Sequence, residues 1–278
     1  MPPRGPSDEK RFQFGKNWER FLSVLDDERM AQAEHSLREM LEVTNLRGLS
    51  FVDVGSGSGL FSLAAKRLGA ARVHSFDYDP NSVACTRELK RRFYPNDADW
   101  TIEQGSALDR AYVQSLGTFD IVYSWGVLHH TGEMWRALEN TTGLVRSVGR
   151  LFIALYNDQG STSRRWLVIK RIYNHSSLPF RIGLSLGVQF YWELRALVGR
   201  ILRLENPLPF KTWRDKRRER GMSVWHDCVD WVGGYPFEVA RPEDVFAFCL
   251  KRGFALRRLK TAGGGHGNNE FVFVRDLA

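Results

Sequence analysis

Short apolar runs alternate with helical segments over roughly the first half of the chain. Five runs have the length of β-strands and cover residues 50–54, 72–76, 100–103, 119–124 and 150–156. Helical segments are predicted after the first, second and fourth runs, over 60–68, 80–92 and 133–146. The last run is nearly all apolar over 151–155, as expected of a parallel strand that is buried on both faces. The pattern predicts an α/β fold with five β/α units.

The two ends of the chain carry further elements of secondary structure. Apolar residues recur at roughly helical spacing over 19–42, which predicts an N-terminal helix. Near the C-terminus, Pro242 and two acidic residues open a helix that runs to residue 252. Apolar runs over 254–259 and 270–274 then predict two more strands.

About 85 residues between 157 and 240 are not needed by these elements, and such a segment is too long for a bare loop. Within it, apolar residues share one helical face and charged residues lie opposite: Phe190, Leu194, Leu197, Val198 and Ile201 against Glu193, Arg195, Arg200 and Arg203. We interpret this segment as a helical cap over the carboxyl edge of the sheet, where ligands bind in open α/β folds. A membrane-surface helix or a dimer contact is the alternative, because the polar face is largely basic.

Three glycines, Gly55, Gly57 and Gly59, stand at every second position between the first strand and its helix. Glycine suits such a turn, because the backbone adopts positive φ and a ligand can approach without meeting a Cβ atom. The spacing differs from the Gly-x-Gly-x-x-Gly of dinucleotide-binding turns, and Asp53 precedes the first glycine by two residues. A carboxylate there repels a pyrophosphate and attracts an amine or a sulfonium, so a cationic ligand is predicted.

A second carboxylate, Asp77, ends the second strand about 20 residues after the glycine turn. At that distance, a strand-end carboxylate in a doubly wound fold can accept both hydrogen bonds from a ribose diol. Asp79 is the alternative ribose ligand. The acidic residue before the glycine turn, followed by this strand-end carboxylate, resembles the cofactor-binding motifs of the class I S-adenosylmethionine-dependent methyltransferases.

The resemblance covers about residues 49–156 and the C-terminal strands. It implies a Rossmann-like fold: a doubly wound, mostly parallel seven-stranded sheet with an antiparallel last strand, plus the helical cap insertion. The implied domains are an N-terminal helical segment over the cofactor (1–48), the cofactor-binding core (49–156), the cap (157–240), and a helix and β-hairpin that complete the core (241–278). In the first of these, Phe14, Asn17 and Trp18 are candidates for ligand contact.

S-adenosylmethionine is the cofactor that the resemblance implies, and no metal ion is expected. The implied cofactor-binding residues are Asp53, Gly55, Ser56, Gly57, Gly59, Asp77, Tyr78, Ser106, Ala107, Ser124 and Trp125. Ser106 departs from the family pattern, which often has Asp at this position to bond the adenine amino group. A serine hydroxyl can still form that bond, but without charge assistance.

Methyl transfer from a sulfonium depends mainly on alignment and on the exclusion of water, so no catalytic motif is obligatory. An acceptor oxygen of high pKa, or a protonated amine, still has to lose a proton to a base. The candidate bases are His129 and His130 after the fourth strand, Tyr156 at the end of the fifth, His226 in the insertion and His266 in the loop 262–269. We expect His226 and His266 to face the acceptor.

The bulk composition narrows the class of protein. A chain of 278 residues with 43% hydrophobic composition is enough for one large α/β domain or a smaller one with an elaboration. The formal charge of +8 permits anionic partners. The three cysteines form no C-x-x-C pair, which suggests neither a disulfide framework nor a zinc site and fits the cytoplasm. Residues 1–10 lack the apolar core of a secretory signal, and no apolar run reaches membrane-spanning length.

The function predicted from these observations is S-adenosylmethionine-dependent methyl transfer to an oxygen or nitrogen atom of a small polar metabolite. One alternative is an RNA methyltransferase that uses the basic run 211–220. The segment after the fourth strand contains no Asn-Pro-Pro-Tyr type sequence, the signature of base amino-methylation. A dinucleotide-dependent oxidoreductase and a binding module without turnover are the remaining alternatives.

Overall fold

The computed structural model describes residues 22, 25–203, 224–263, 265 and 267–276. These residues form two compact units. The first contains the described residues up to 163 together with 236–276, and the second contains those between 164 and 235.

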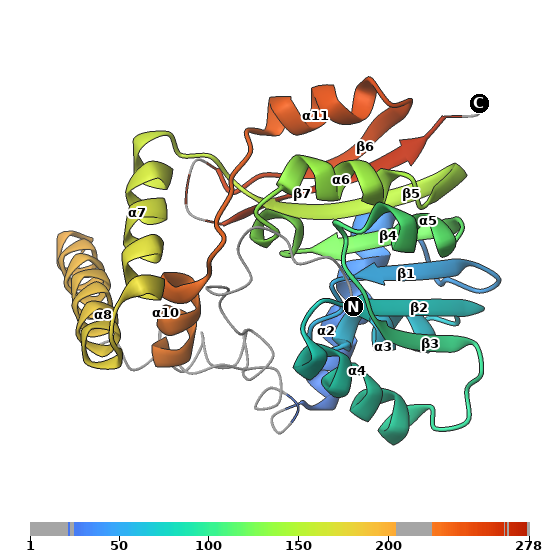
Figure 1. Cartoon of the computed structure of the whole chain (residues 1–278), viewed down its shortest axis with the longest axis horizontal. Helices are drawn as coiled ribbons and strands as arrows, with labels where there is room; N and C mark the ends of the chain where they lie inside the picture. The colour runs from blue at the N-terminus through green and yellow to red at the C-terminus, as the bar shows by residue number, and fades with distance from the viewer. Residues whose placement is uncertain (1–21, 23–24, 204–223, 264, 266, 277–278) are drawn as a thin grey trace. The chain divides into compact units, whose positions relative to one another are not determined.

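A seven-stranded sheet with the order β3-β2-β1-β4-β5-β7-β6 forms the first unit (Figure 1). Its strands are β1 (Ser50–Val54), β2 (Arg72–Asp77), β3 (Trp100–Gln104), β4 (Phe119–Trp125), β5 (Val145–Tyr156), β6 (Phe254–Lys260) and β7 (Asn268–Arg275). The first five strands pair in parallel, whereas β7 is antiparallel to both β5 and β6. The predicted mostly parallel sheet with an antiparallel last strand is confirmed. Its strand order reverses between β1 and β4, and ligands bind at such a point in open α/β sheets.

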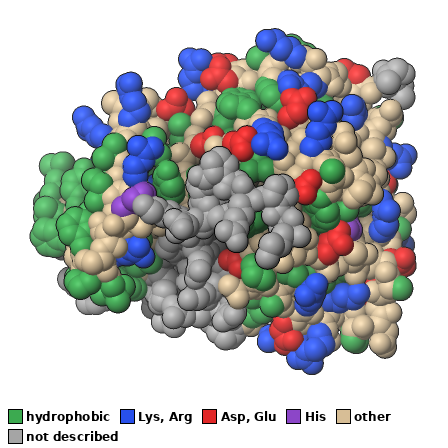
Figure 2. All heavy atoms as spheres, in the orientation of Figure 1, with side chains coloured by type: hydrophobic (Ala, Val, Ile, Leu, Met, Phe, Trp, Pro, Cys, Tyr) green, Lys and Arg blue, Asp and Glu red, His purple; other side chains and the backbone are tan. Residues whose placement is uncertain are grey.

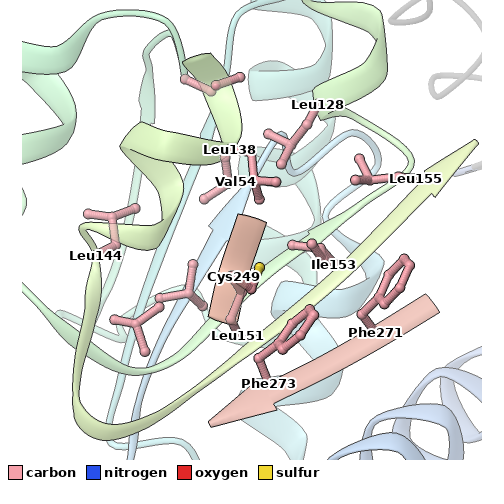
Figure 3. Close-up of a cluster of buried hydrophobic side chains, with 14 of the residues drawn as sticks. Val54, Leu128, Leu138, Leu144, Leu151, Ile153, Leu155, Cys249, Phe271 and Phe273 are labelled. Atoms are coloured by element: carbon pink, nitrogen blue, oxygen red, sulfur yellow. The ribbon is translucent and has the colours of Figure 1, made fainter. Parts of the chain in front are cut away.

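Helices cover both faces of this sheet. They are α2 (Asp27–Leu41), α3 (Leu60–Arg67), α4 (Pro80–Phe93), α5 (Arg110–Ser115), α6 (Met134–Thr142) and α11 (Pro242–Leu250), with a short 3-10 helix η2 (Leu128–His130) after β4. One buried cluster joins the sheet to α6 and α11, through side chains such as Leu138 and Cys249 against Leu151 and Phe273 (Figure 3). The other cluster joins the opposite face to α2, α3 and α4. The alternating strand positions thus supply two separate cores.

Several boundaries differ from those predicted. The helical stretch predicted over 19–42 is interrupted at Asp26, whose carboxylate accepts the Arg29 N–H at 2.9 Å and caps α2. The predicted helix 133–146 ends at Thr142, because β5 begins at Val145 rather than at residue 150. Helix α5 was not predicted, since six residues are too few to show a helical period.

Helices make up the second unit: the greater part of α7 (Ser161–His175), α8 (Leu178–Leu202) and α10 (Val224–Gly233). The indole of Trp166 on α7 packs against Trp192 of α8 and Trp231 of α10, with ring centroids 6.0 and 5.6 Å apart. Lys170 is fully buried and donates to the backbone carbonyl of Trp231. Its ammonium also lies 4.6 Å from the centre of the Trp231 ring, which replaces part of the hydration lost on burial.

Candidate active site

The glycine turn between β1 and α3 is held by close packing as well as by backbone conformation. Gly55, Gly57 and Gly59 have φ values of 82°, 54° and 81°. A Cβ atom on Gly55 would lie 2.3 Å from a methyl carbon of Val127, and one on Gly59 would lie 2.8 Å from the Cα of Thr86. The absence of side chains therefore allows the segment after β4 and helix α4 to pack directly on the turn.

Asp77 ties the end of β2 to this turn. Its Oδ2 accepts the backbone N–H of Gly57 at 2.9 Å, and its Oδ1 accepts that of Asp79 at 2.8 Å. Burial raises the pKa of Asp77 to about 6, although these two hydrogen bonds act in the opposite direction. Each carboxylate oxygen keeps a further lone pair that a ligand hydroxyl can use. Asp79 instead caps α4 by accepting the Asn81 N–H at 2.9 Å.

A chain of buried hydrogen bonds leads from Asp53 through the core. Ser62 on α3 donates to Asp53 Oδ2 at 2.6 Å, Ser75 on β2 donates to Ser62 at 2.7 Å, and the indole N–H of Trp100 donates to Ser75 at 2.9 Å. Asp53 is only 2% exposed. Burial, with a smaller contribution from the charge of Asp77, raises the pKa of Asp53 to about 7.

In the part of the chain that the structure describes, no cationic side chain is among the causes of the pKa shift of either Asp53 or Asp77. One buried and one partly buried acidic group, with no counter-charge among the described residues, oppose the binding of an anion and favour a ligand that carries positive charge. These residues therefore fit a sulfonium cofactor better than a dinucleotide pyrophosphate.

The other predicted cofactor-binding residues surround the same turn. Ser56 shares a hydrogen bond with Thr86 at 3.0 Å, and Ser124 on β4 donates to the carbonyl of Val54 at 2.9 Å. These bonds fix the backbone at the ends of β1 and β4. Tyr78 follows Asp77 and is 43% exposed, as a side chain that meets a ligand must be.

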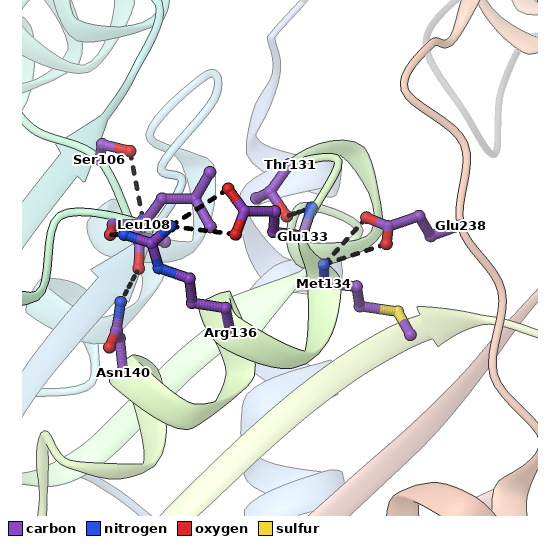
Figure 4. A network of polar contacts seen from close by, with 9 residues as sticks. Ser106, Leu108, Thr131, Glu133, Met134, Arg136, Asn140 and Glu238 are labelled. Carbon is purple, nitrogen blue, oxygen red and sulfur yellow. Dashed lines mark hydrogen bonds and ion pairs between the residues drawn. The ribbon is translucent and has the colours of Figure 1, made fainter. Parts of the chain in front are cut away.

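Ser106 and Ala107 lie in the loop between β3 and α5. The Ser106 hydroxyl accepts the Leu108 N–H at 3.2 Å, and the Ala107 carbonyl accepts the side-chain amide of Asn140 at 2.9 Å (Figure 4). The hydroxyl therefore closes a local turn, and its own hydrogen stays available as a donor.

Two residues in the central part of the sheet were not predicted from the sequence: Tyr123, on which the charges of Asp53 and Glu270 both act, and Glu270 itself. Tyr123 pairs with Asp53 in the register of β4 and β1, and its ring stacks on Phe61 with centroids 4.8 Å apart. Within the described structure, its buried hydroxyl has no hydrogen-bond partner.

Glu270 on β7 follows Asn268 and Asn269 and precedes the apolar residues of the strand. Burial raises its pKa, although the charge of Lys260 and a hydrogen bond from Trp125 act in the opposite direction. Glu270 lies beside two asparagines at the start of its strand, so no clear signal marked it in the sequence.

Two of the predicted bases, His130 and Tyr156, come together at the carboxyl ends of β4 and β5. Their rings meet edge to face, with centroids 5.3 Å apart, and Tyr156 also packs on Phe237 at 5.4 Å. His130 Nδ1 lies 2.6 Å from the carbonyl oxygen of Pro236. A carbonyl only accepts, so Nδ1 carries the hydrogen, and Nε2 holds the lone pair in the neutral ring.

His129 uses its Nδ1 as a hydrogen-bond acceptor, whereas His130 uses its Nδ1 as a donor. His129 is fully buried, its Nδ1 accepts the backbone N–H of Tyr156 at 3.3 Å, and the two rings lie 3.8 Å apart. These contacts give His129 a supporting position under Tyr156. His226 lies in α10, but its side chain is outside the described part of the structure, and His266 is outside it altogether.

The segment that carries Pro236 and Phe237 is anchored beside this cluster by Glu238. Both carboxylate oxygens of Glu238 accept the backbone N–H of Met134 at the start of α6, at 2.9 and 3.1 Å (Figure 4). A carboxylate is favourable there because a helix N-terminus presents unpaired N–H groups. Within the described residues, no group of His, Cys, Asp or Glu side chains could hold a metal ion.

Comparison with known protein families bears on the same region. The family model described as a methyltransferase domain matches residues 52–153, which contain the glycine turn, Asp77 and His130. The core is a class I S-adenosylmethionine-dependent methyltransferase domain. The oxidoreductase alternative is thereby removed. The methyltransferase domain contains Asp53 but not Tyr156, which follows its last matched residue.

Curated relatives of this methyltransferase domain include ribosomal protein L11 methyltransferases. The protein from Anoxybacillus flavithermus is 28% identical over 156 residues, 50% of each chain. The one from Methylococcus capsulatus is 46% identical over 54 residues, 19% of this chain and 18% of the relative. The chain thus spans about half or less of the length of these relatives.

Solved methyltransferase structures share the fold over nearly the whole chain. Magnesium protoporphyrin IX methyltransferase from Synechocystis PCC 6803, crystallised with S-adenosylhomocysteine (SAH), has a TM-score of 0.54 at 15% identity and covers 94% of this chain and 95% of its own. The N-methyltransferase NodS from Bradyrhizobium japonicum, also with SAH, has a TM-score of 0.50 at 13% identity and covers 95% and 99%. At these identities the likeness concerns the fold alone.

Proposed function

We propose that the protein transfers a methyl group from S-adenosylmethionine to an oxygen or nitrogen atom of a small polar acceptor. The observation that carries the proposal is the pair Asp53 and Asp77, two carboxylates at the glycine turn whose pKa shifts have no cationic side chain among their causes in the described part of the structure. His130 and Tyr156 lie at the ends of β4 and β5, on the same carboxyl edge as the turn.

The cofactor, when bound, supplies a methyl group on a positively charged sulfur, and its departure leaves a neutral thioether. Asp77 is positioned to receive the ribose hydroxyls, because its oxygens already face the turn. Asp53 is almost fully buried and can offer a ligand little surface, so we assign it an electrostatic role: its charge acts on the cofactor across the glycine turn. Tyr78, Ser106 and Ala107 then fall beside the adenine.

His130 is the described residue best suited to remove a proton from the acceptor. Its hydrogen bond to Pro236 fixes the tautomer in which Nε2 can accept a proton, and Tyr156 limits the rotation of the ring. An acceptor hydroxyl would transfer its proton to Nε2 as its oxygen attacks the methyl group, whereas an ammonium group would transfer its proton first, because the nitrogen lone pair is free to attack only after that proton has left. His226 and His266 remain proposed bases for the same step.

The first experiment separates cofactor binding from turnover. Calorimetric titration of the full chain with SAH should show binding, and NADH should show none. Methyl incorporation from labelled cofactor into fractionated small-molecule extract should then identify the acceptor. Absence of SAH binding would overturn the proposal, and binding without incorporation into any fraction would indicate a module without turnover.

A protein acceptor is the second candidate, favoured by the ribosomal protein L11 methyltransferases among the relatives. Purified ribosomal protein L11 and ribosomes from a strain lacking its methyltransferase provide the direct test. Label appearing in that protein, with none in the small-molecule fraction, would replace the small acceptor by a protein one.

A further inference from the structure

Helix α8 presents a long apolar surface to solvent. Large hydrophobic side chains are exposed along its whole length: Leu178, Phe180, Ile182, Leu186, Phe190, Tyr191, Leu194, Val198, Ile201 and Leu202. The exposed fraction of Phe190 is 70%, and those of Leu194 and Val198 are 47% and 48%. Figure 2 shows hydrophobic side chains gathered over this helix. A patch of this extent is uncommon on a monomeric protein and marks an interaction surface.

The exposed side of α8 is apolar across a broad face. Ser185 is buried and marks the side of the helix that packs within the unit. At 100° per residue, Phe190, Leu194 and Ile201 lie roughly opposite Ser185, and no charged residue falls among them. Arg195 and Arg200 fall on the two flanks of this face. Apolar residues flanked by arginines are the arrangement of a helix that lies in the plane of a membrane surface.

The charge of the surrounding sequence favours an anionic occupant. Residues 161–203, which contain α7 and α8, hold eight Lys or Arg residues and a single acidic one, Glu193. Lys170 is buried, so the other residues of this segment carry seven positive charges and one negative, a balance of +6, compared with +8 for all 278 residues. A second copy of the same face would bring two such charges together, whereas an anionic lipid surface would neutralise them.

We propose that α8 docks on an anionic membrane surface, with its axis in the plane of the membrane and Phe190, Leu194 and Val198 inserted at the headgroup boundary. In the part of the chain that the structure describes, no helix is long and apolar enough to cross a membrane. Arg195, which is exposed on one flank of the inserted face, would meet lipid phosphates. This proposal does not depend on the methyl acceptor.

Flotation of the full-length protein with vesicles tests the proposal. One set of vesicles contains phosphatidylcholine alone, and the other contains about 30% phosphatidylglycerol. We expect at least about tenfold tighter binding to the anionic vesicles, weakened by about 0.5 M salt. No retention on anionic vesicles at low salt would overturn the proposal.

Paired variants locate the contact. Phe190→Gln with Leu194→Gln should reduce vesicle binding by about tenfold, because both side chains lose their apolar contact. Leu250→Gln is the matched control: Leu250 is an exposed leucine on α11, and its replacement should leave binding unchanged. Thermal unfolding checks that each variant folds. The assignment of the membrane contact to α8 would be contradicted if vesicle binding fell equally in the double variant and in Leu250→Gln. It would also be contradicted if vesicle binding did not fall in the double variant.

Gly187 distinguishes a membrane from a second copy of the chain. A Cβ atom on Gly183 or Gly187 meets nothing within 4 Å, and glycines four residues apart allow two helices to pack closely. Gly187→Leu adds apolar surface, so it should preserve or strengthen vesicle binding. If α8 pairs with itself, the same substitution should instead abolish a dimer seen by light scattering. The proposal would be overturned if the unmodified protein formed a dimer that Gly187→Leu abolishes and if the unmodified protein did not bind vesicles.

Discussion

The carboxylate of Asp77 accepts the backbone N–H of Gly57 at 2.9 Å, which joins the end of β2 to the middle of the glycine turn. The bond closes a contact between residues 20 positions apart. It also places a partly buried carboxylate at the edge where two parallel strands end. The glycine turn and the proposed ribose ligand Asp77 are therefore joined directly. A substitution in either one should change the affinity of the protein for its cofactor.

Asp77→Asn should weaken SAH binding by about tenfold or more, because a neutral amide forms weaker hydrogen bonds than a carboxylate. The free energy of unfolding should fall by about 1–3 kcal/mol, since the single amide oxygen can accept only one of the Gly57 and Asp79 N–H groups. Calorimetry and chemical unfolding measure the two effects. Asp79→Asn is the control, because asparagine also caps α4 well. A larger affinity loss in Asp79→Asn would identify Asp79 as the ribose ligand.

Ser62→Ala should lower the free energy of unfolding by about 1–3 kcal/mol. The substitution leaves the buried carboxyl of Asp53 without its 2.6 Å hydrogen bond and removes the acceptor of Ser75. Urea unfolding at constant pH measures the change. Ser147→Ala, at an exposed position of β5, should stay within about 0.5 kcal/mol. Similar values for the two variants would show that the buried chain of hydrogen bonds adds little stability.

The stability of the cofactor-free protein should fall as the pH rises from about 4 to about 7. Burial raises the pKa of Asp53 to about 7 and that of Asp77 to about 6, so both bind protons more tightly in the folded state. Their contribution is complete below the pKa of the unfolded chain, near 3.9, and is lost as the pH passes the folded values. Unfolding free energies across this range should show the decline.

Asp53→Asn should reduce this pH dependence, because the amide does not titrate. A cationic ligand favours the ionised carboxylates, so cofactor affinity should rise between pH 6 and pH 7 in the unmodified protein. Calorimetry in buffers of different ionisation enthalpy should detect release of protons on binding of S-adenosylmethionine. An affinity that is flat with pH, with no proton release, would contradict a role for the two carboxylates in attracting charge.

His130→Asn should reduce turnover by about 10²- to 10⁴-fold while SAH affinity stays unchanged. Asparagine can still donate to the carbonyl of Pro236, but it lacks the nitrogen that accepts the proton. The turnover–pH profile should lose its ascending limb. Full activity in His130→Asn, together with a loss in His226→Ala or His266→Ala, would transfer the role of base to one of those residues.

Much of the core could be predicted because its signals are local. β1 begins and ends at Ser50 and Val54 as its apolar run indicates, and Pro80 opens α4. The seven-stranded sheet followed from the resemblance and is confirmed. The short helix α5 and the early start of β5 were missed, because six residues show no period and because Arg146, Ser147 and Gly149 interrupt the apolar run of the strand.

The sequence by itself determined the strands, the glycine turn, the two acidic residues and the class of cofactor, since each depends on residues close together in the chain. The tertiary structure decided which groups meet. Asp53 accepts a hydrogen bond from Ser62, which itself accepts one from Ser75. His129 accepts the backbone N–H of Tyr156, whereas His130 bonds to the carbonyl of Pro236. These contacts join residues up to 106 positions apart, so they depend on strand register and helix packing, which no local pattern encodes.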